Sequence, residues 1–210
     1  MNSKNILIWV GATILVFVVL FFVYQLTNVP VATYFPEMNK IGTLDHTKWN
    51  KNSKNILVEF TDFECPACRD RYLFLKDLEK TATPNAVFVS RNFPLYQVHT
   101  LAFKAAYAVE AAGIQGKYWE MEDELFQNQP QWSVLGDPNN YFIDLAKKLN
   151  LDIDKFKKDI DSKVVIDHVQ ADMAQGNGAG VNSTPTFFLN GKIVNVNTLA
   201  EFKQLLLSLK

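Results

Sequence analysis

The two cysteines of this chain stand three positions apart, at Cys65 and Cys68, and its 210 residues hold no other cysteine. An apolar run at residues 56–60 precedes them, and a helical pattern over residues 71–80 follows. A Cys-x-x-Cys pair between a strand and a helix is the arrangement that thiol–disulfide exchange requires. The stretch therefore fixes a strand, a junction and a helix in that order, and it predicts a redox pair at the junction.

Cys65 is expected at the N-terminus of that helix. Unpaired backbone N–H groups and the positive end of the helix dipole favour a thiolate over a thiol there. Pro66 suits the first turn because its missing N–H would have no partner in any case. Cys68 follows one turn later on the same face. We therefore expect Cys65 to be the attacking sulfur and Cys68 to be the resolving one.

Two other interpretations of the cysteine pair are open. A structural disulfide would close a very short loop and add little stability. A structural zinc site needs four ligands, yet the chain has no second Cys-x-x-Cys, and His46, His99 and His168 are scattered along it. Redox chemistry is favoured, and we expect no metal site and no cofactor apart from the Cys65–Cys68 disulfide.

Residues 5–26 carry no charged side chain and are mostly Ile, Leu, Val and Phe. As a helix they would be roughly 33 Å long, which is enough to cross a bilayer core of about 30 Å. Lys4 precedes the run and the next charged residue is Glu37, so the positive-inside rule places the rest of the chain outside the cytoplasm. A cleaved signal peptide is the alternative, with a weak cleavage candidate at residues 31–33. We expect an uncleaved signal anchor, a transmembrane helix, over residues 1–26.

The segment 27–54 contains several structure breakers and has weak periodicity. It is predicted to be a linker that ends by adding a strand or short helix near residues 44–49. The remaining part, residues 55–210, is long enough for one sizeable core. With 21 Lys and Arg against 22 Asp and Glu, the chain has no basic footprint for nucleic acid.

Strand and helix patterns follow the cysteine motif. A buried strand is predicted at residues 86–89. Helical periodicity then covers residues 99–112, 117–126, 139–149, 152–160 and 162–175. Glycines within residues 176–180 are expected to end this block. Asn190-Gly191 between two apolar runs predicts a β-hairpin, and residues 199–209 form an amphipathic helix that would cover a sheet. The order predicts an α/β fold with a mixed sheet.

Three stretches carry a resemblance to a known family. They are residues 59–68 (Glu-Phe-Thr-Asp-Phe-Glu-Cys-Pro-Ala-Cys), residues 115–126, which open Gln-Gly-Lys-Tyr-Trp-Glu, and residues 184–188 (Thr-Pro-Thr-Phe-Phe). Together they resemble the DsbA-like thiol–disulfide oxidoreductases of the thioredoxin superfamily. The likeness covers about residues 54–210 and keeps the order of the three motifs.

The resemblance implies a thioredoxin fold with an inserted helical domain at about residues 97–176. It also implies that Thr184-Pro185 is the family's cis-proline loop and faces the disulfide. A cis X–Pro bond occurs in about one of twenty such bonds and marks a constrained turn. There the Thr184 backbone would pair with an extended substrate by strand addition, and Pro66 and Ala67 would complete the substrate-binding surface. From its own sequence context alone, Pro185 would merely start an edge strand.

Glu59 stands where the family often has a buried acid. On a strand that is buried on both faces its pKa should be raised, so that it accepts or delivers a proton as Cys68 changes state. The alternative is a strand-edge glutamate whose carboxylate reaches water. The expected catalytic residues are therefore Cys65, Cys68, Glu59 and Pro185.

The dipeptide between the cysteines departs from the strongly oxidising family members, which have a histidine at the position of Ala67. Because Ala67 brings no positive charge to the Cys65 thiolate, backbone N–H groups must stabilise it. We therefore expect a less extreme lowering of the Cys65 pKa and a less oxidising potential. His99 is expected to be an ordinary polar group in the first turn of a helix.

The implied function is a membrane-anchored thiol–disulfide oxidoreductase that forms disulfides in exported or unfolded proteins with thiols. It would be a single-pass protein of the bacterial cytoplasmic membrane with its catalytic domain on the extracytoplasmic side. Since the chain has no second redox pair, the resemblance implies a quinone-linked, DsbB-like membrane partner that reoxidises it. A disulfide reductase or isomerase of the same fold is one alternative, and a non-catalytic module that binds extended peptides is another.

Overall fold

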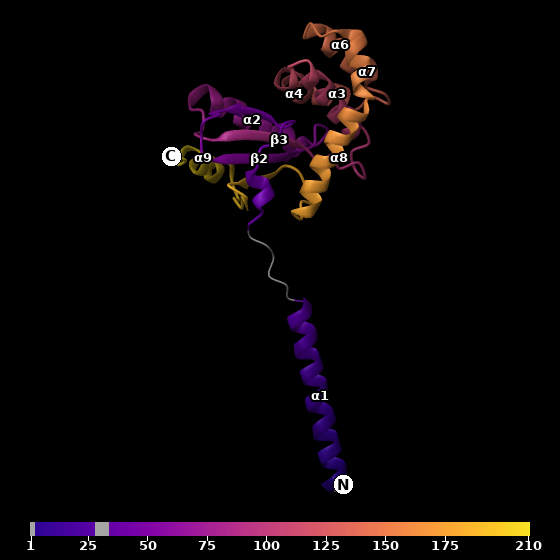
Figure 1. Ribbon diagram of the computed structural model, residues 1–210, viewed down its shortest axis with the longest axis vertical. Coiled ribbons are helices and arrows are strands. Elements are labelled where there is room, and N and C mark those ends of the chain that lie inside the picture. Colours follow the sequence, from indigo (N-terminus) through magenta and orange to yellow (C-terminus); the bar gives the residue numbers. More distant parts are fainter. Residues whose placement is uncertain (1–2, 28–33) are drawn as a thin grey trace. The chain divides into compact units, whose positions relative to one another are not determined.

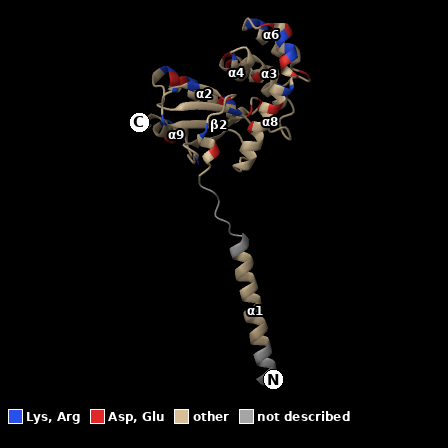
Figure 2. Ribbon diagram, viewed as in Figure 1, with Lys and Arg blue, Asp and Glu red and all other residues tan. Residues whose placement is uncertain are grey.

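The computed structural model describes residues 3–27 and 34–210, and the side chains of residues 9–24 and 34–210. It comprises two compact units, Met1–Thr33 and Tyr34–Lys210. The described part of the first unit is helix α1 (Ser3–Thr27), drawn in indigo in Figure 1. In Figure 2 the coloured part of α1 is tan throughout, with no Lys, Arg, Asp or Glu, and its large apolar side chains, among them Phe17 and Phe21, are exposed.

The predicted membrane span at residues 5–26 lies within α1. Among the side chains that the structure describes, no helix is both long and apolar enough to cross a membrane. The two ends of the predicted span, residues 5–8 and 25–26, lie outside those side chains.

Five strands form one sheet in the second unit, in the order β1-β3-β2-β4-β5. They are β1 (His46–Trp49), β2 (Ile56–Thr61), β3 (Val87–Asn92), β4 (Thr186–Leu189) and β5 (Lys192–Ile193). Strands β2 and β3 run parallel, whereas all other neighbours are antiparallel. The predicted α/β fold with a mixed sheet and a central strand at residues 56–60 is confirmed.

The sheet is covered on both faces. Helices α2 (Pro66–Thr81) and α9 (Leu199–Leu207) pack on one face, and the short helix η1 (Pro36–Asn39) packs on the other. Successive side chains of β2 alternate between the faces, as an extended strand requires. Leu57 packs with Phe202 of α9, and Val58 packs with Met38 of η1. Because fully burying such a side chain stabilises a fold by about 1.5–3 kcal/mol, β2 is held firmly from both sides.

Between β3 and β4, where every residue is described, the chain forms a block of six helices. They are α3 (Ala102–Ile114), α4 (Tyr118–Gln127), α5 (Gln129–Trp132), α6 (Asn139–Lys148), α7 (Ile153–Ile160) and α8 (Lys163–Gly178). Their core contains the fully buried rings of Trp132, Phe142 and Phe156. In Figure 1 this helical block lies at one end of the sheet, and α8 leads back towards the strands.

Helix α8 continues past the point where the glycines were expected to end it. The prediction is wrong for the first residues of the glycine-rich stretch, because α8 ends at Gly178. A Cβ at position 176 would lie 2.7 Å from the ring of Phe93 and 3.0 Å from that of Phe60. Gly176 therefore allows α8 to pack closely against the sheet. Gly180, with φ of +77°, is the residue that follows the helix in the left-handed region.

The second unit begins at Tyr34, earlier than the predicted start at residue 55. Part of the predicted linker 27–54 is folded, because it holds η1 and β1, and β1 pairs with β3. The predicted strand or short helix near residues 44–49 is present as β1, whose four residues are all half-buried. Residues 28–33 of that segment lie outside the described residues.

The predicted hairpin at Asn190-Gly191 is present between β4 and β5. Both turn residues have positive φ, 50° at Asn190 and 77° at Gly191, as the tight turn favoured in hairpins requires. The β4–β5 pairing follows directly from this turn.

Candidate functional site

The cysteine pair lies at the junction of β2 and α2. Cys65 is the N-cap residue of α2 and Pro66 is its first helical residue. Cys65 is 7% exposed and Cys68 is fully buried, and both are free thiols in this structure. Pro66 and Ala67 are exposed, so these two residues form the solvent-facing surface over the sulfurs.

The two thiols differ in acidity. Hydrogen bonds from the Cys68 thiol and from backbone N–H groups of Cys68 and Ala67 lower the pKa of Cys65 to about 5, against the effect of burial. Burial raises the pKa of Cys68 well above its ordinary value, and the hydrogen bond and charge of Cys65 raise it further. Cys65 is therefore the thiolate at neutral pH. This pKa lies above about 3.5, the lower end of the range known for such cysteines, and the expected effect of alanine at position 67 stays a prediction.

The cis-proline loop faces the pair. The Thr184–Pro185 peptide bond is cis, as the resemblance implied. Cys65 Sγ lies 3.5 Å from the carbonyl oxygen of Thr184, although the two residues are 119 positions apart. They meet because β4 pairs antiparallel with β2, with Thr186 opposite Phe60. This pairing brings the residues just before β4 to the end of β2 where the cysteines follow.

Glu59 lies on β2 and is 5% exposed. Burial and the neighbouring Glu122 carboxylate raise its pKa to about 8, and the positive charges of Lys48 and Arg71 offset this only in part. The charge of Glu59 in turn contributes to the raised pKa of Cys68. The predicted buried acid is confirmed, and the alternative of a glutamate whose carboxylate reaches water is wrong. Its role in proton transfer stays a prediction.

Comparison with known proteins gives the family. A protein-family model described as Thioredoxin matches residues 45–207. The chain belongs to the thioredoxin family. Alpha-DsbA1 from Wolbachia pipientis superposes with a TM-score of 0.68 at 22% identity, over 83% of this chain and 94% of that one. Oxidised BdbD from Bacillus subtilis does so with a TM-score of 0.67 at 19% identity, over 83% and 95% of the two chains. The fold is therefore the DsbA-like form of the thioredoxin fold.

Curated relatives match over part of their length. The Na(+)/H(+) antiporter NhaA 1 of Mycolicibacterium vanbaalenii is 36% identical over 151 residues, which is 70% of this chain and 23% of that protein. The chain spans about a quarter of the length of the curated relatives that it matches. The antiporter activity in that name belongs to the whole relative and is not transferred to this chain.

An Asp62–His99 pair lies beside the cysteines of this thioredoxin-family site. Asp62 Oδ2 is 2.8 Å from His99 Nδ1 and accepts the backbone N–H of Leu95, also at 2.8 Å. The backbone N–H of Asp62 donates to Cys68 Sγ at 3.4 Å. The interpretation of His99 as an ordinary first-turn residue is wrong, because α3 begins only at Ala102. The aspartate three positions before Cys65 was the one visible signal for this pair.

The pair bears on the charge around the Cys65 thiolate. Burial lowers the pKa of His99, but the hydrogen bond and charge of Asp62, and the charge of Cys65, raise it above its usual value overall. The interaction of His99 with Cys65 thus favours the charged forms of both groups, a contribution that Ala67 cannot make. Sequence reasoning missed this contribution because His99 lies far from the cysteines along the chain.

Gln129 is a second residue that sequence reasoning missed. Its Nε2 donates to the carbonyl oxygens of Phe63 and Cys65, at 2.8 and 2.9 Å, and its side chain is buried. It belongs to the short helix α5, which was not predicted because four residues show no periodicity. Pro130, in the first turn of α5, was the available start signal. Gln129 holds the backbone that positions Cys65.

Proposed function

We propose that this chain is a thiol–disulfide oxidoreductase whose redox pair is Cys65 and Cys68. The observation that carries the proposal is the approach of Cys65 Sγ to within 3.5 Å of the Thr184 carbonyl oxygen, directly before the cis Pro185. The thiolate is the nucleophile in disulfide exchange, and the pKa of about 5 makes Cys65 a thiolate at neutral pH. The membership of the thioredoxin family supports the same chemistry.

In the oxidising direction a substrate thiolate attacks Cys65 Sγ of the enzyme disulfide. The Cys65–Cys68 bond breaks, a mixed disulfide forms, and Cys68 takes up a proton because its pKa is high. A second substrate thiolate then attacks the substrate sulfur of the mixed disulfide, and Cys65 leaves as a thiolate. Two electrons pass from the substrate dithiol to the enzyme, so the substrate gains a disulfide and the enzyme ends reduced. Cys65 leaves readily because thiols of low pKa are good leaving groups.

Glu59 is the proposed source of the Cys68 proton. With a pKa of about 8 it is mostly protonated at neutral pH, so it can deliver a proton as Cys68 leaves and take one back when the disulfide reforms. The substrate segment would lie across the exposed Pro66 and Ala67 and pair with the Thr184 backbone. Pro185 would keep that backbone exposed to it.

We favour oxidation of exported or unfolded proteins with thiols as the physiological direction. A lowered pKa of Cys65 stabilises the reduced enzyme, which makes its disulfide the stronger oxidant. A quinone-linked, DsbB-like membrane protein would then reoxidise the enzyme. A disulfide reductase or isomerase of the same fold is the second candidate, favoured by the lack of a charged residue at Ala67.

We further propose that residues 5–26 anchor the chain in the bacterial cytoplasmic membrane, with the catalytic unit on the extracytoplasmic side. This proposal is supported by the uncharged sequence of that run and by the exposed apolar side chains of α1 between residues 9 and 24. Membranes washed with alkaline carbonate should keep the full chain, and protease added to intact spheroplasts should digest its catalytic unit. Release by carbonate, or full protection from the protease, would contradict the anchor and its orientation.

Trapping tests the proposed chemistry. The variant Cys68→Ser should accumulate a mixed disulfide with an oxidised model peptide, because no second thiol resolves it, whereas Cys65→Ser should form none. Equal trapping by both variants would refute the assigned roles. Equilibration of the full chain with glutathione then separates the directions, since about 30 mV corresponds to a tenfold change in the equilibrium constant. A function that survives Cys65→Ser in cells would favour the peptide-binding module instead.

A further inference from the structure

A second polar cluster is built from residues outside the redox site, where β1, α3 and α8 meet. It consists of His46 in β1, Glu110 in α3 and His168 in α8. Glu110 Oε2 is 2.8 Å from His46 Nε2 and 2.9 Å from His168 Nδ1. One ligand atom from each residue lies within 4.8 Å of the others, and this is the one such group among the described residues. His46 and His168, which are scattered along the chain, thus come together in space.

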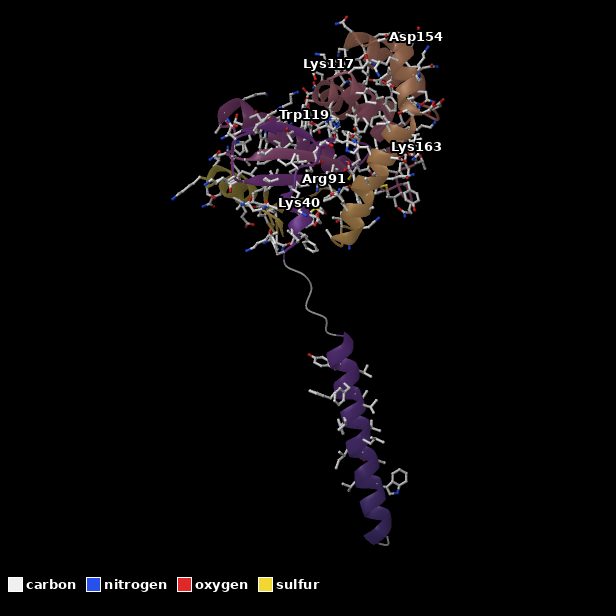
Figure 3. The ribbon with its side chains drawn as sticks, in the orientation of Figure 1. Lys40, Arg91, Lys117, Trp119, Asp154 and Lys163 are labelled. Atoms are coloured by element: carbon white, nitrogen blue, oxygen red, sulfur yellow. The ribbon has the colours of Figure 1, made fainter. Side chains whose placement is uncertain are left out.

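The cluster is largely removed from water. Glu110 is 3% exposed, and its carboxylate oxygen Oε2 faces both imidazoles. Asp172, also buried, adds a second carboxylate next to His168. Arg91, labelled beside Lys40 in Figure 3, is already paired: its guanidinium donates to Asp45 Oδ2 at 2.9 Å and to the Lys40 carbonyl oxygen at 2.8 Å.

A supporting shell fixes the three side chains. Asn92 Nδ2 donates to Glu110 Oε1 at 2.7 Å and to Asp172 Oδ2 at 3.0 Å. The second ring nitrogen of His168, Nε2, is 3.8 Å from Asp172 Oδ1. At 3.8 Å the two groups are in electrostatic contact but are too far apart for a hydrogen bond. The His46 ring is held by stacking on Tyr118, with ring centroids 3.7 Å apart.

A cavity beside the three side chains leaves space for an ion and is open to solvent. A cavity of about 220 Å³ is lined by His46, Glu110, Gly113 and His168 among others. A Cβ at position 113 would lie 2.7 Å from His46 Cε1, so the glycine of α3 is what lets the imidazole reach Glu110. The side chain of His46 is 19% exposed, which gives an ion a path from solvent.

We propose that His46, Glu110 and His168 bind a divalent first-row transition metal ion, with Zn²⁺ as the best match. Two imidazole nitrogens and one carboxylate oxygen form a known zinc ligand set that leaves a further position for water. The hard cations Ca²⁺ and Mg²⁺ prefer oxygen ligands throughout. The ion displaces the protons that the two ring nitrogens share with Glu110. It thereby joins β1 of the sheet to α3 and α8 of the helical block.

Zinc titration of the full chain in detergent tests this site. The double variant Cys65→Ser/Cys68→Ser is the starting protein, because the two sulfurs are themselves zinc ligands. It should compete with a chromogenic chelator for a single Zn²⁺. Adding His46→Asn, Glu110→Gln or His168→Gln should weaken binding by more than about 100-fold, whereas His99→Gln, which changes the remaining histidine, should not. Equal affinity in all four variants would overturn the proposal.

A second measurement keeps all ligands in place and does not depend on the folding of those variants. In the same starting protein, Co²⁺ should give the intense visible bands of a four-coordinate site, and Zn²⁺ should raise the unfolding temperature with concentration. A featureless Co²⁺ spectrum together with an unfolding temperature unchanged by Zn²⁺ would show that the cluster is only a buried ion-pair network. Because the cysteines are absent, this result is independent of the redox proposal.

Discussion

Two buried glutamates in this molecule differ in protonation state at neutral pH, because their neighbours differ. Glu59 and Glu110 are 5% and 3% exposed, yet the pKa of Glu59 is raised to about 8 and that of Glu110 is lowered to about 2. Glu59 has another carboxylate, Glu122, as a neighbour, whereas Glu110 accepts hydrogen bonds from two imidazoles. Burial alone therefore does not set the charge of a carboxyl group. The neighbouring groups keep the carboxyl group of Glu59 mostly protonated and that of Glu110 ionised at neutral pH.

Removing the Glu110 carboxylate should have the largest effect, a loss of stability. In the presence of a chelator, Glu110→Ala should lower the free energy of unfolding by about 3–5 kcal/mol, because the buried donors of His46, His168 and Asn92 lose their acceptor. Urea unfolding measures the change, with the exposed Glu37→Ala as control. The contribution of Glu110 is complete above its ordinary pKa of 4.5 and is lost as the pH falls through about 2. If Glu110→Ala lowers the free energy of unfolding no more than Glu37→Ala does, Glu110 is not a stabilising buried anion and does not differ from Glu59 in this way.

Adding a side chain at Gly113, next to His46, should lower the free energy of unfolding by less than removal of the Glu110 carboxylate does. Gly113→Ala should destabilise by about 1–3 kcal/mol, the usual result of overpacking, because the new Cβ would lie 2.7 Å from His46 Cε1. Gly178→Ala is the matched control in α8, since a Cβ there has nothing within 4 Å, and it should be neutral or stabilising by about 0.5–1 kcal/mol. Two helical glycines would thus respond in opposite directions, as urea unfolding can show. The same response from both would mean that His46 moves aside easily.

Replacing Glu59, the proposed proton donor, should change both the rate of disulfide exchange and the pH dependence of stability. Glu59→Gln should slow disulfide exchange with a model peptide by about tenfold or more and leave the domain folded. Between pH 4.5 and about 8 the folded protein keeps a proton on Glu59 that the unfolded chain has released. The free energy of unfolding of the wild type, relative to the variant, should therefore fall as pH rises through this window. An unchanged exchange rate would remove Glu59 from the proton path.

The smallest expected effect concerns the partly exposed imidazole beside the cysteines. His99→Gln should raise the pKa of Cys65 by less than about one unit, because water screens the charge of His99. Ultraviolet absorbance of the thiolate follows the titration. His99→Arg, which keeps a positive charge, should restore the wild-type value. If both variants titrate like the wild type, Cys65 owes its acidity to the hydrogen bonds at the start of α2.

The redox site was largely predictable because its signals lie in short stretches of sequence. Cys65 and Cys68 follow a strand and open a helix, and Asn190-Gly191 marks the hairpin. The resemblance then placed Pro185 at the cysteines, where the structure has it in the cis form. Each of these features depends on neighbouring residues or on one strand pairing, so it can be predicted from the sequence.

The histidine cluster was not predictable for the opposite reason. His46, Glu110 and His168 come from three elements, and they meet because β1 pairs with β3 while α8 packs on β3 and on α3. All four residues of the strand that carries His46 are half-buried. Gly176, which resembles a helix end in the sequence, is inside α8 because the helix packs on Phe93. Tertiary contacts decide these positions, and local sequence does not encode them.

The outermost strands of the sheet are very short, four residues in β1 and two in β5. Few unpaired backbone N–H and C=O groups are therefore available at either edge of the sheet for pairing with a strand of another chain. Under the proposed function, an unfolded substrate that pairs with the Thr184 backbone would find few further main-chain groups to pair with at the two edges of the sheet. The short edge strands would therefore limit aggregation of bound substrates on the enzyme.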